Sequence, residues 1–147
     1  MSLYATAHSS CDTLRQEVLI SGRHRLVTDE PIRLGGTDQG PAPHELLPAA
    51  VAACVVTTIR MYARTKGWEL GDLTVGVVYD HQSVPRTFEV DIDLPDGLTA
   101  DQTRRIMRAA ETCPIRRAIE AGMTIDERLG SVSPGGFAPV EATEAIA

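Results

Sequence analysis

The sequence predicts a single α+β domain with antiparallel strands around one long, buried helix. Two observations lead to this fold class. β-branched, partly alternating stretches come in pairs before and after one long apolar run, and two further helical patterns follow the second pair. The order β-β-loop-α-β-β-α-α-β is typical of an α+β domain with mainly antiparallel sheet. We expect the domain to span residues 1–130 and residues 131–147, rich in Gly, Pro, Ala and Glu, to form a flexible tail.

The composition excludes several classes of function. A chain of 147 residues can bury a core without disulfide bonds, and its 4% aromatic content predicts a core of aliphatic side chains. The net charge of −6 argues against general binding of nucleic acids or anionic membranes, because both need basic surface. A local basic cluster at Arg104, Arg105 and Arg108 is interpreted more simply as the solvated face of a helix.

The sequence favours a cytoplasmic protein. The N-terminal residues lack the basic and apolar segments of a signal peptide, and Pro48 and Arg60 interrupt the longest apolar run, so we expect no membrane span. Three cysteines without CxxC spacing do not form a secreted disulfide framework. In a reducing compartment, such cysteines are either inert core residues or redox groups.

The first elements are expected to be two strands and an irregular loop. Leu14–Ser21 and Arg23–Asp29 have strand character, with Ser21-Gly22 as the hairpin turn. Cys11, in the polar segment before them, is expected to have no role. Glycines and prolines keep residues 30–43 out of regular structure.

A long helix is predicted from about His44 to Lys66. Apolar and small side chains recur at spacings of three and four, at Leu47, Ala50, Val51, Cys54, Thr58 and Met61. Pro48 lies early enough to be tolerated, and Gly67 is a suitable end. Because apolar residues also fill the other faces, we expect this helix to be buried nearly all round.

The second half of the chain is expected to supply a hairpin, two helices and a last strand. The strands are Asp72–Asp80 and Thr87–Leu94. A capping box at Thr99-Ala100-Asp101-Gln102 opens a helix that ends near Thr112. Pro114–Ala121 forms a short helix closed by a glycine, and the final strand is MTIDERL, residues 123–129.

Two thiols are the candidates for chemistry. Cys54, in a helix interior, would by itself be interpreted as a core residue. Cys113 immediately precedes Pro114 at a helix start, where N–H groups favour a thiolate, so the residues alone mark Cys113 as the more acidic thiol. The histidines and cysteines are too scattered for zinc, no histidine stands out as a hydrolase base, and no nucleotide-binding motif is present. The pattern leaves a dithiol enzyme and an inert core open.

The sequence resembles the OsmC/Ohr family. The resemblance rests on the run DEPIRLGGTDQGPAPHELLPAAVAACVVTTIRMYARTKGW and on AAETCPIRRAIE further along, and extends over nearly the whole chain before the tail. Its most specific parts are the GG–GP–P–EL–AAC block and the A-x-x-CP motif. The pattern is closest to an OsmC-like branch that has diverged from classical Ohr and OsmC, which carry NPE before the helix and ACF around its cysteine.

The resemblance implies an intertwined α+β homodimer that reduces apolar organic hydroperoxides in an oxidative stress response. By this resemblance Cys54 is the peroxidatic thiol, which becomes a sulfenic acid, and Cys113 resolves it as a disulfide. An external dithiol, such as a dihydrolipoyl group, would then reduce the disulfide, with no bound cofactor or metal. The alternative is a stress-related or small-molecule-binding dimer without efficient peroxidase activity.

The activating residues depart from the family pattern. Classical members place a Glu directly after the Pro of NPE to hold an Arg against the thiolate. Here His44 follows Pro43, and the carboxylate, Glu45, comes one residue later, a rotation of about 100° on a helix. Glu45 is equally interpretable as a first-turn residue that complements the helix dipole. Arg33, or alternatively Arg23, is the expected arginine, although surface exposure is the simpler interpretation of each.

Overall fold

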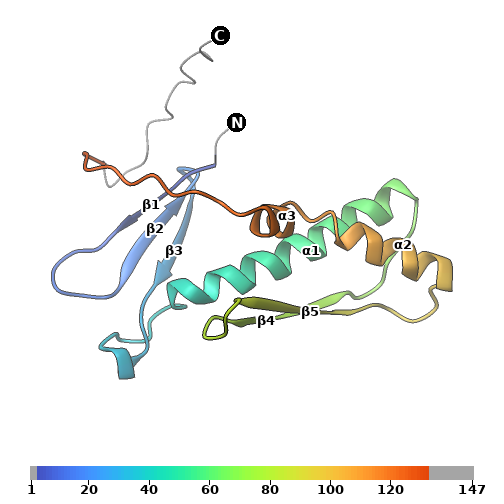
Figure 1. Ribbon diagram of the computed structural model, residues 1–147, viewed down its shortest axis with the longest axis horizontal. Helices are drawn as coiled ribbons and strands as arrows, with labels where there is room; N and C mark the ends of the chain where they lie inside the picture. The colour runs from blue at the N-terminus through green and yellow to red at the C-terminus, as the bar shows by residue number, and fades with distance from the viewer. Residues whose placement is uncertain (1–2, 133–147) are drawn as a thin grey trace, which may run out of the picture. The chain divides into compact units, whose positions relative to one another are not determined.

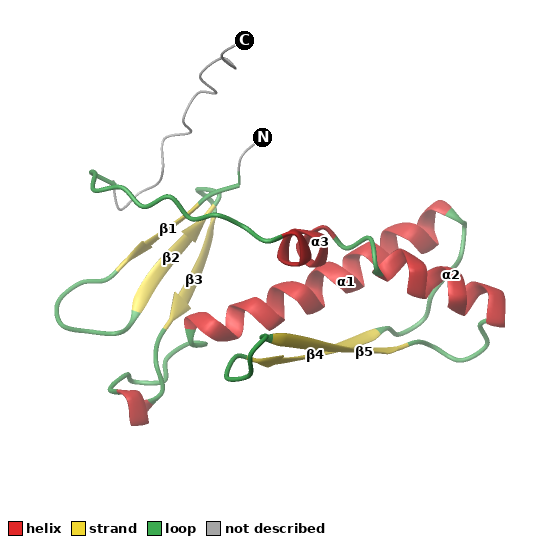
Figure 2. Ribbon diagram, in the orientation of Figure 1, coloured by secondary structure: helices red, strands yellow, loops and turns green. Residues whose placement is uncertain are grey.

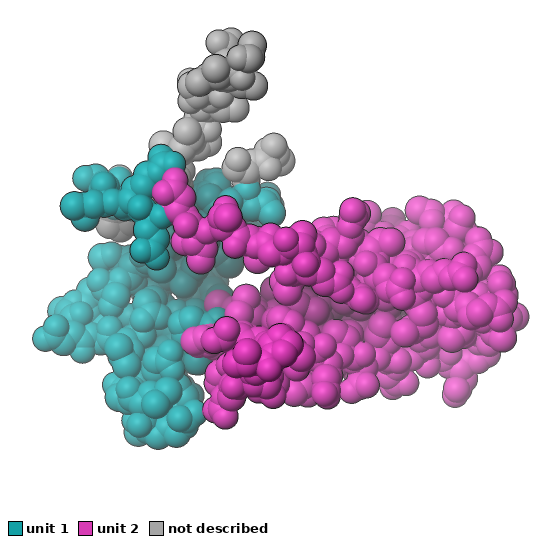
Figure 3. All heavy atoms as spheres, viewed as in Figure 1, with its two compact units in different colours: residues 1–43, 127–147 teal, residues 44–126 magenta. Residues whose placement is uncertain are grey.

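The computed structural model describes residues 3–132, in two compact units. Unit 1 contains residues 1–43 and 127–147, and unit 2 contains residues 44–126, as Figure 3 shows by colour. Each unit is described by itself. Most of the predicted tail, residues 133–147, lies outside the described residues, so its flexibility stays a prediction.

Unit 1 is built on a three-stranded antiparallel sheet in the order β1-β2-β3 (Figure 1). The strands are β1 (Ala5–His8), β2 (Gln16–Ile20) and β3 (His24–Thr28). The β2–β3 hairpin was predicted from the sequence and is confirmed, with Val18 opposite Leu26. The first strand was not predicted, because its four residues, ATAH, carry little β propensity of their own.

A loop after β3 is held by one buried carboxylate. Asp29, 1% exposed, accepts hydrogen bonds from its neighbour's N–H, from the N–H and hydroxyl of Thr37, and from the Gln39 N–H. These bonds lower the pKa of Asp29, the Thr37 hydroxyl most strongly. Gly36 lies so close to the chain that an added Cβ would stand 1.8 Å from the Glu30 carbonyl oxygen. The loop is therefore ordered although it contains no strand.

Unit 2 is organised around α1 (Leu46–Thr65), which a short 3₁₀ turn, η2 (Pro43–Glu45), precedes. β4, α2 and α3 pack against α1 within the unit (Figure 2). The prediction of a helix buried nearly all round is wrong for this chain alone. One stripe is buried, at Val51, Val55, Ile59 and Ala63, because the packed elements cover one side of the helix.

The opposite side of α1 is open. Leu47 is 44% exposed and Met61, expected on the inner stripe, is 61% exposed. Ala49, Ala53 and Thr57 are exposed on the same side. This leaves an apolar helix face with no cover among the described residues.

By length and composition, residues 43–65 could cross a membrane, with a mean hydropathy of 1.6. The sequence predicted that Pro48 and Arg60 would interrupt this apolar run. The helix instead continues without a break through both residues. Pro48 lies in the first turn, where no intrahelical N–H is needed, and the Arg60 guanidinium donates to the Leu70 carbonyl oxygen at 2.7 Å. A core helix meets the same criterion, and α1 supplies the core of unit 2, so these properties are weak evidence for a membrane span.

The second sheet of the fold is the antiparallel hairpin β4 (Thr74–Asp80) and β5 (Thr87–Asp93). Both strands were predicted. Val75, Val77, Phe88 and Ile92 pack against the core, as the alternation of the sequence indicates. Val90 faces the same way and is 39% exposed, because a cavity lies beneath it.

Two helices complete unit 2: α2 (Ala100–Ala110) and α3 (Pro114–Ala121). The capping box is confirmed: Gln102 N–H donates to Thr99 Oγ1 at 3.1 Å, and Thr99 N–H donates to Gln102 Oε1 at 2.9 Å. The predicted strand at residues 123–129 is wrong for this chain. The segment belongs to no strand, and Met123, Ile125 and Leu129 are at least 73% exposed.

Candidate functional site

The structure brings the two candidate thiols together within unit 2. Cys54 lies on α1, in its third turn, and Cys113 is the N-cap residue of α3. The two thiols lie close enough to influence each other, because the Cys113 thiol helps to raise the pKa of Cys54. A disulfide bond between them would bring the sulfurs to about 2.05 Å.

Cys113 is held by a tight connection between α2 and α3. Its N–H donates to the Ala110 carbonyl oxygen at 3.2 Å, and its carbonyl oxygen accepts from the Arg117 N–H at 3.0 Å. Its ψ of 122° is the extended conformation that a following proline favours. Pro114 thus ends one helix and starts the next, and the turn between them places the Cys113 sulfur against α1.

The two sulfurs differ in access. Cys113 is fully buried, at 0% exposure, in the cluster formed by Val51, Val55, Ile59, Ile106 and Ala110. Cys54 is partly exposed. A small molecule from solution can therefore reach Cys54 first, and the nearest reaction partner of Cys113 is Cys54.

The environment of Cys54 raises its pKa. Burial is the largest cause, because it disfavours the charged thiolate, and the neighbouring Cys113 adds to it. The Ile115 N–H at the start of α3 acts in the opposite direction, since it favours a thiolate. The Thr58 hydroxyl donates to the Cys54 carbonyl oxygen, so its proton is already engaged there. Within unit 2, therefore, a hydrogen-bond donor reaches the thiol but does not make it acidic.

The carboxylate and histidine at the start of α1 lie away from the thiols. Glu45 precedes Cys54 by nine residues, about 13 Å along a helix and on its opposite face. Glu45 is exposed. His44 is exposed as well and lies beside His81, with ring centroids 5.8 Å apart. The structure does not bring Glu45 to Cys54.

The expected arginines belong to unit 1. Arg33 is exposed in η1 (Ile32–Leu34), the short helix inside the loop that Asp29 holds. Arg23 is exposed in the turn between β2 and β3. A role for either residue beside Cys54, in unit 2, stays a prediction.

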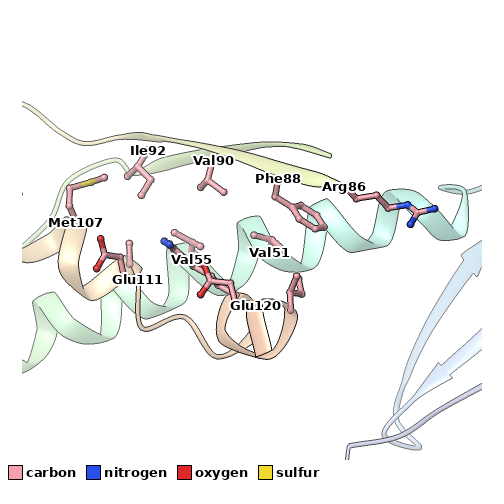
Figure 4. A pocket seen from close by; sticks show the side chains of 12 residues that line it. Val51, Val55, Arg86, Phe88, Val90, Ile92, Met107, Glu111 and Glu120 are labelled. Carbon is pink, nitrogen blue, oxygen red and sulfur yellow. Dashed lines mark hydrogen bonds and ion pairs between the residues drawn. The ribbon is translucent and has the colours of Figure 1, made fainter. Parts of the chain in front are cut away.

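An apolar cavity of about 540 Å³ lies in unit 2, between α1, β5, α2 and α3 (Figure 4). Val51 and Val55 form its floor, and Phe88, Val90 and Ile92 line one wall. Charged groups also line it, and these are Arg86, Glu111, Arg116 and Glu120. Neither thiol is among its lining residues.

A second hollow, an open groove of about 650 Å³, runs between α1 and α2, and neither thiol is among its lining residues. At one end it is lined by Thr58, whose hydroxyl donates to the Cys54 carbonyl oxygen at 2.8 Å, and by Thr112 and Pro114, which flank Cys113. The rest of its lining is Met61, Tyr62, Thr65, Arg105, Arg108 and Ala109.

The family follows from comparison with known proteins. The sequence pattern of the OsmC-like protein family matches residues 36–128, which is more than half of the chain and includes both thiols. The chain belongs to the OsmC-like protein family. No curated protein matches the sequence.

Solved structures of this family share the fold. The organic hydroperoxide resistance protein OsmC of Legionella pneumophila is 25% identical, with a TM-score of 0.58 over 81% of this chain and 89% of that one. The OsmC-like protein of Mycoplasma pneumoniae is 16% identical, with a TM-score of 0.63 over 82% and 88%. An organic hydroperoxide resistance protein of Elizabethkingia anophelis is 22% identical, with a TM-score of 0.57 over 80% and 86%. The mixed α+β fold predicted from the sequence is confirmed.

Other groups in this OsmC-like chain do not join the thiol site. Cys11 is exposed in the β1–β2 connection of unit 1. Between residues 3 and 132, no three His, Cys, Asp or Glu side chains are grouped to hold a metal ion. The sequence reasoning missed the effect of the Ile115 N–H on Cys54, because it assigned the N–H groups at the start of α3 to Cys113.

Proposed function

We propose that this OsmC-like protein is a thiol peroxidase that reduces organic hydroperoxides through Cys54 and Cys113. The observation that carries the proposal is the contact between a partly exposed and a fully buried thiol. This difference in access gives the two sulfurs different roles. It supports Cys54 as the thiol that meets the peroxide and Cys113 as the thiol that resolves it.

The first step oxidises Cys54. Its thiolate attacks one oxygen of the hydroperoxide, an S–O bond forms, and the O–O bond breaks with its electron pair on the departing alkoxide. The alkoxide takes a proton and leaves as the alcohol, and Cys54 becomes a sulfenic acid. The Ile115 N–H, which favours the thiolate, assists this step.

The second step closes the disulfide. The Cys113 sulfur attacks the Cys54 sulfur, an S–S bond forms, and the hydroxyl group leaves as water after taking a proton. An external dithiol, such as a dihydrolipoyl group, then exchanges with the disulfide and restores both thiols as it is itself oxidised. We place this cycle in the reducing cytoplasm, where such dithiols are maintained.

None of the largest influences on the pKa of Cys54 comes from a cation. Burial keeps the pKa of Cys54 raised, and only the thiolate attacks peroxides. We infer that Arg33, or Arg23, stands beside the thiolate in the active assembly. Glu45 would contribute only by holding that arginine, because it lies about 13 Å from Cys54 along α1.

The direct test is turnover with cumene hydroperoxide and a dithiol. The unmodified protein should consume the peroxide, and Cys54→Ser should reduce the rate to that of the uncatalysed reaction. Cys11→Ser, a substitution of an exposed thiol in unit 1, is the matched control and should retain full activity. Undiminished turnover in Cys54→Ser would rule out the proposal.

A second candidate function is binding of a small apolar molecule without efficient peroxidase chemistry. The raised pKa of Cys54 and the apolar cavity of about 540 Å³ favour it. The two functions differ in one observable result. One equivalent of hydroperoxide should consume two thiols of a peroxidase and none of a binding protein.

A further inference from the structure

The fold brings together two histidines that the sequence shows as scattered. His44 lies in η2, immediately before α1, and His81 follows the last residue of β4. Both residues belong to unit 2, in which β4 packs against α1. Their ring centroids are 5.8 Å apart and the rings are tilted by 36°. The two imidazoles are therefore neighbours at one end of unit 2.

Both imidazoles are available to a ligand from solution. His44 and His81 are exposed, and within residues 3–132 no hydrogen bond or ion pair engages either ring. The Tyr79 ring lies beside that of His81, with centroids 6.0 Å apart, and is itself stacked on Phe88 at 4.4 Å. A neutral imidazole keeps one nitrogen as an acceptor, which is the atom that a metal ion binds.

The turn that carries His81 is ordered by its own hydrogen bonds. Asp80 Oδ1 accepts from the Gln82 N–H at 3.0 Å and from the Ser83 N–H at 3.1 Å, and Arg86 Nε donates to the His81 carbonyl oxygen at 3.3 Å. Asp80 and Arg86 are the charged residues of this turn. Their charges balance, so the turn carries no net positive charge that would repel a cation.

The separation of the rings suits one shared metal ion. An imidazole nitrogen binds such an ion at about 2.1 Å, which places the ion about 3.2 Å from the ring centroid. Two rings on one tetrahedral ion then have centroids about 5.3 Å apart, close to the observed 5.8 Å. The terminal torsion of histidine is broad, so both rings can turn a nitrogen toward the ion without backbone movement.

We propose that His44 and His81 together bind one divalent transition-metal ion of the class that prefers imidazole, such as Ni²⁺ or Zn²⁺. Each ring supplies one nitrogen, and water or an anionic ligand fills the remaining positions. The ion joins the start of α1 to the end of β4, so it stabilises the folded form of unit 2. This site is separate from the proposed peroxidase chemistry and uses neither thiol.

Isothermal titration of the untagged, reduced protein with NiCl₂ tests the site. Ni²⁺ is the probe because thiolates select Zn²⁺ more strongly, which would bring Cys54 and Cys113 into the measurement. The unmodified protein should bind one Ni²⁺ per chain. His44→Ala and His81→Ala should each weaken binding by at least about tenfold, and the double variant should bind no more weakly than either, because one histidine alone cannot chelate.

His24→Ala is the matched control, because it removes an exposed histidine from β3 of unit 1. It should leave Ni²⁺ binding unchanged, and so should Cys54→Ser and Cys113→Ser. No binding by the unmodified protein, undiminished binding in His44→Ala or His81→Ala, or loss of binding in either cysteine variant would overturn the metal site. Because no turnover is measured, these results are independent of the peroxidase proposal.

Urea denaturation supplies a second readout. Excess Ni²⁺ should raise the unfolding midpoint of the unmodified protein and of His24→Ala, and should have no such effect on His44→Ala or His81→Ala. Without the metal, all four proteins should have the same midpoint, because both substituted histidines of unit 2 are exposed. An equal rise in the His44 and His81 variants would show that Ni²⁺ binds elsewhere and would contradict the proposal.

Discussion

Cys54 receives opposing influences, and their balance decides whether it reacts. Within unit 2, burial and the neighbouring thiol of Cys113 raise its pKa, while the Ile115 N–H lowers it. The sequence alone favoured Cys113 as the acidic thiol, because it starts α3. The structure adds a point that no sequence pattern carries: the Ile115 N–H at the start of α3 lowers the pKa of Cys54, which lies on a different helix.

A pH profile tests the inferred arginine. In a Cys11→Ser background, alkylation of Cys54 by iodoacetamide should level off at a lower pH than the influences of unit 2 alone would give, because a nearby cation lowers the pKa of the thiol. Arg33→Ala should move this profile to higher pH, since only the influences of unit 2 remain. At pH 7 the alkylation rate should then fall by about tenfold for each pH unit of the shift.

Arg25→Ala removes an exposed arginine of β3 and is the control for Arg33→Ala. It should leave the pH profile unchanged. If the Arg33→Ala profile coincides with that of the unmodified protein, Arg33 does not activate Cys54, and Arg23→Ala becomes the next variant to measure.

At the scale of elements, the sequence predicted correctly those features that depend on residues close together in the chain. The capping box at Thr99 and Gln102, and the Pro114 start of α3, are confirmed because the responsible side chains lie within a few residues of each other. The two hairpins are confirmed for the same reason. The failures concern longer-range packing. The burial of α1 and the strand at residues 123–129 depend on what covers them, which periodicity cannot show.

The capping box offers a stability test. Thr99→Ala removes the acceptor for the Gln102 N–H and should lower the free energy of unfolding by about 1 kcal/mol. Gln102→Glu keeps the reciprocal bonds and adds a negative charge at the N-terminus of α2, so it should be neutral or slightly stabilising. Urea denaturation of both variants checks the prediction. Equal midpoints for Thr99→Ala and the unmodified protein would show that α2 does not depend on its cap.

At the scale of the whole molecule, one side of α1 is an apolar surface that the described residues leave uncovered. Ala49, Ala53 and Thr57 are small, exposed and spaced by four, which allows close approach of another helix, and Met61 continues this face. This face accounts for the difference between the predicted and observed burial of α1. We propose that a second copy covers it, as the homodimer expected from the sequence requires.

Sedimentation equilibrium tests the dimer. The unmodified protein should have the mass of two chains, and Ala53→Glu should shift it toward one, because a carboxylate in an apolar interface is costly. Ala118→Glu makes the same change at an exposed position of α3 and should leave the dimer intact. A monomeric unmodified protein, or a dimeric Ala53→Glu protein, would contradict this arrangement.

The central claim is that Cys54 and Cys113 form a redox pair, and a thiol count tests it most directly. The reduced protein is mixed with one equivalent of cumene hydroperoxide, free thiols are counted, and the peptides are examined by mass spectrometry. The account predicts that two of the three thiols disappear, with Cys54 joined to Cys113 and Cys11 still free. If both Cys54 and Cys113 remain reduced, the peroxidase account is wrong.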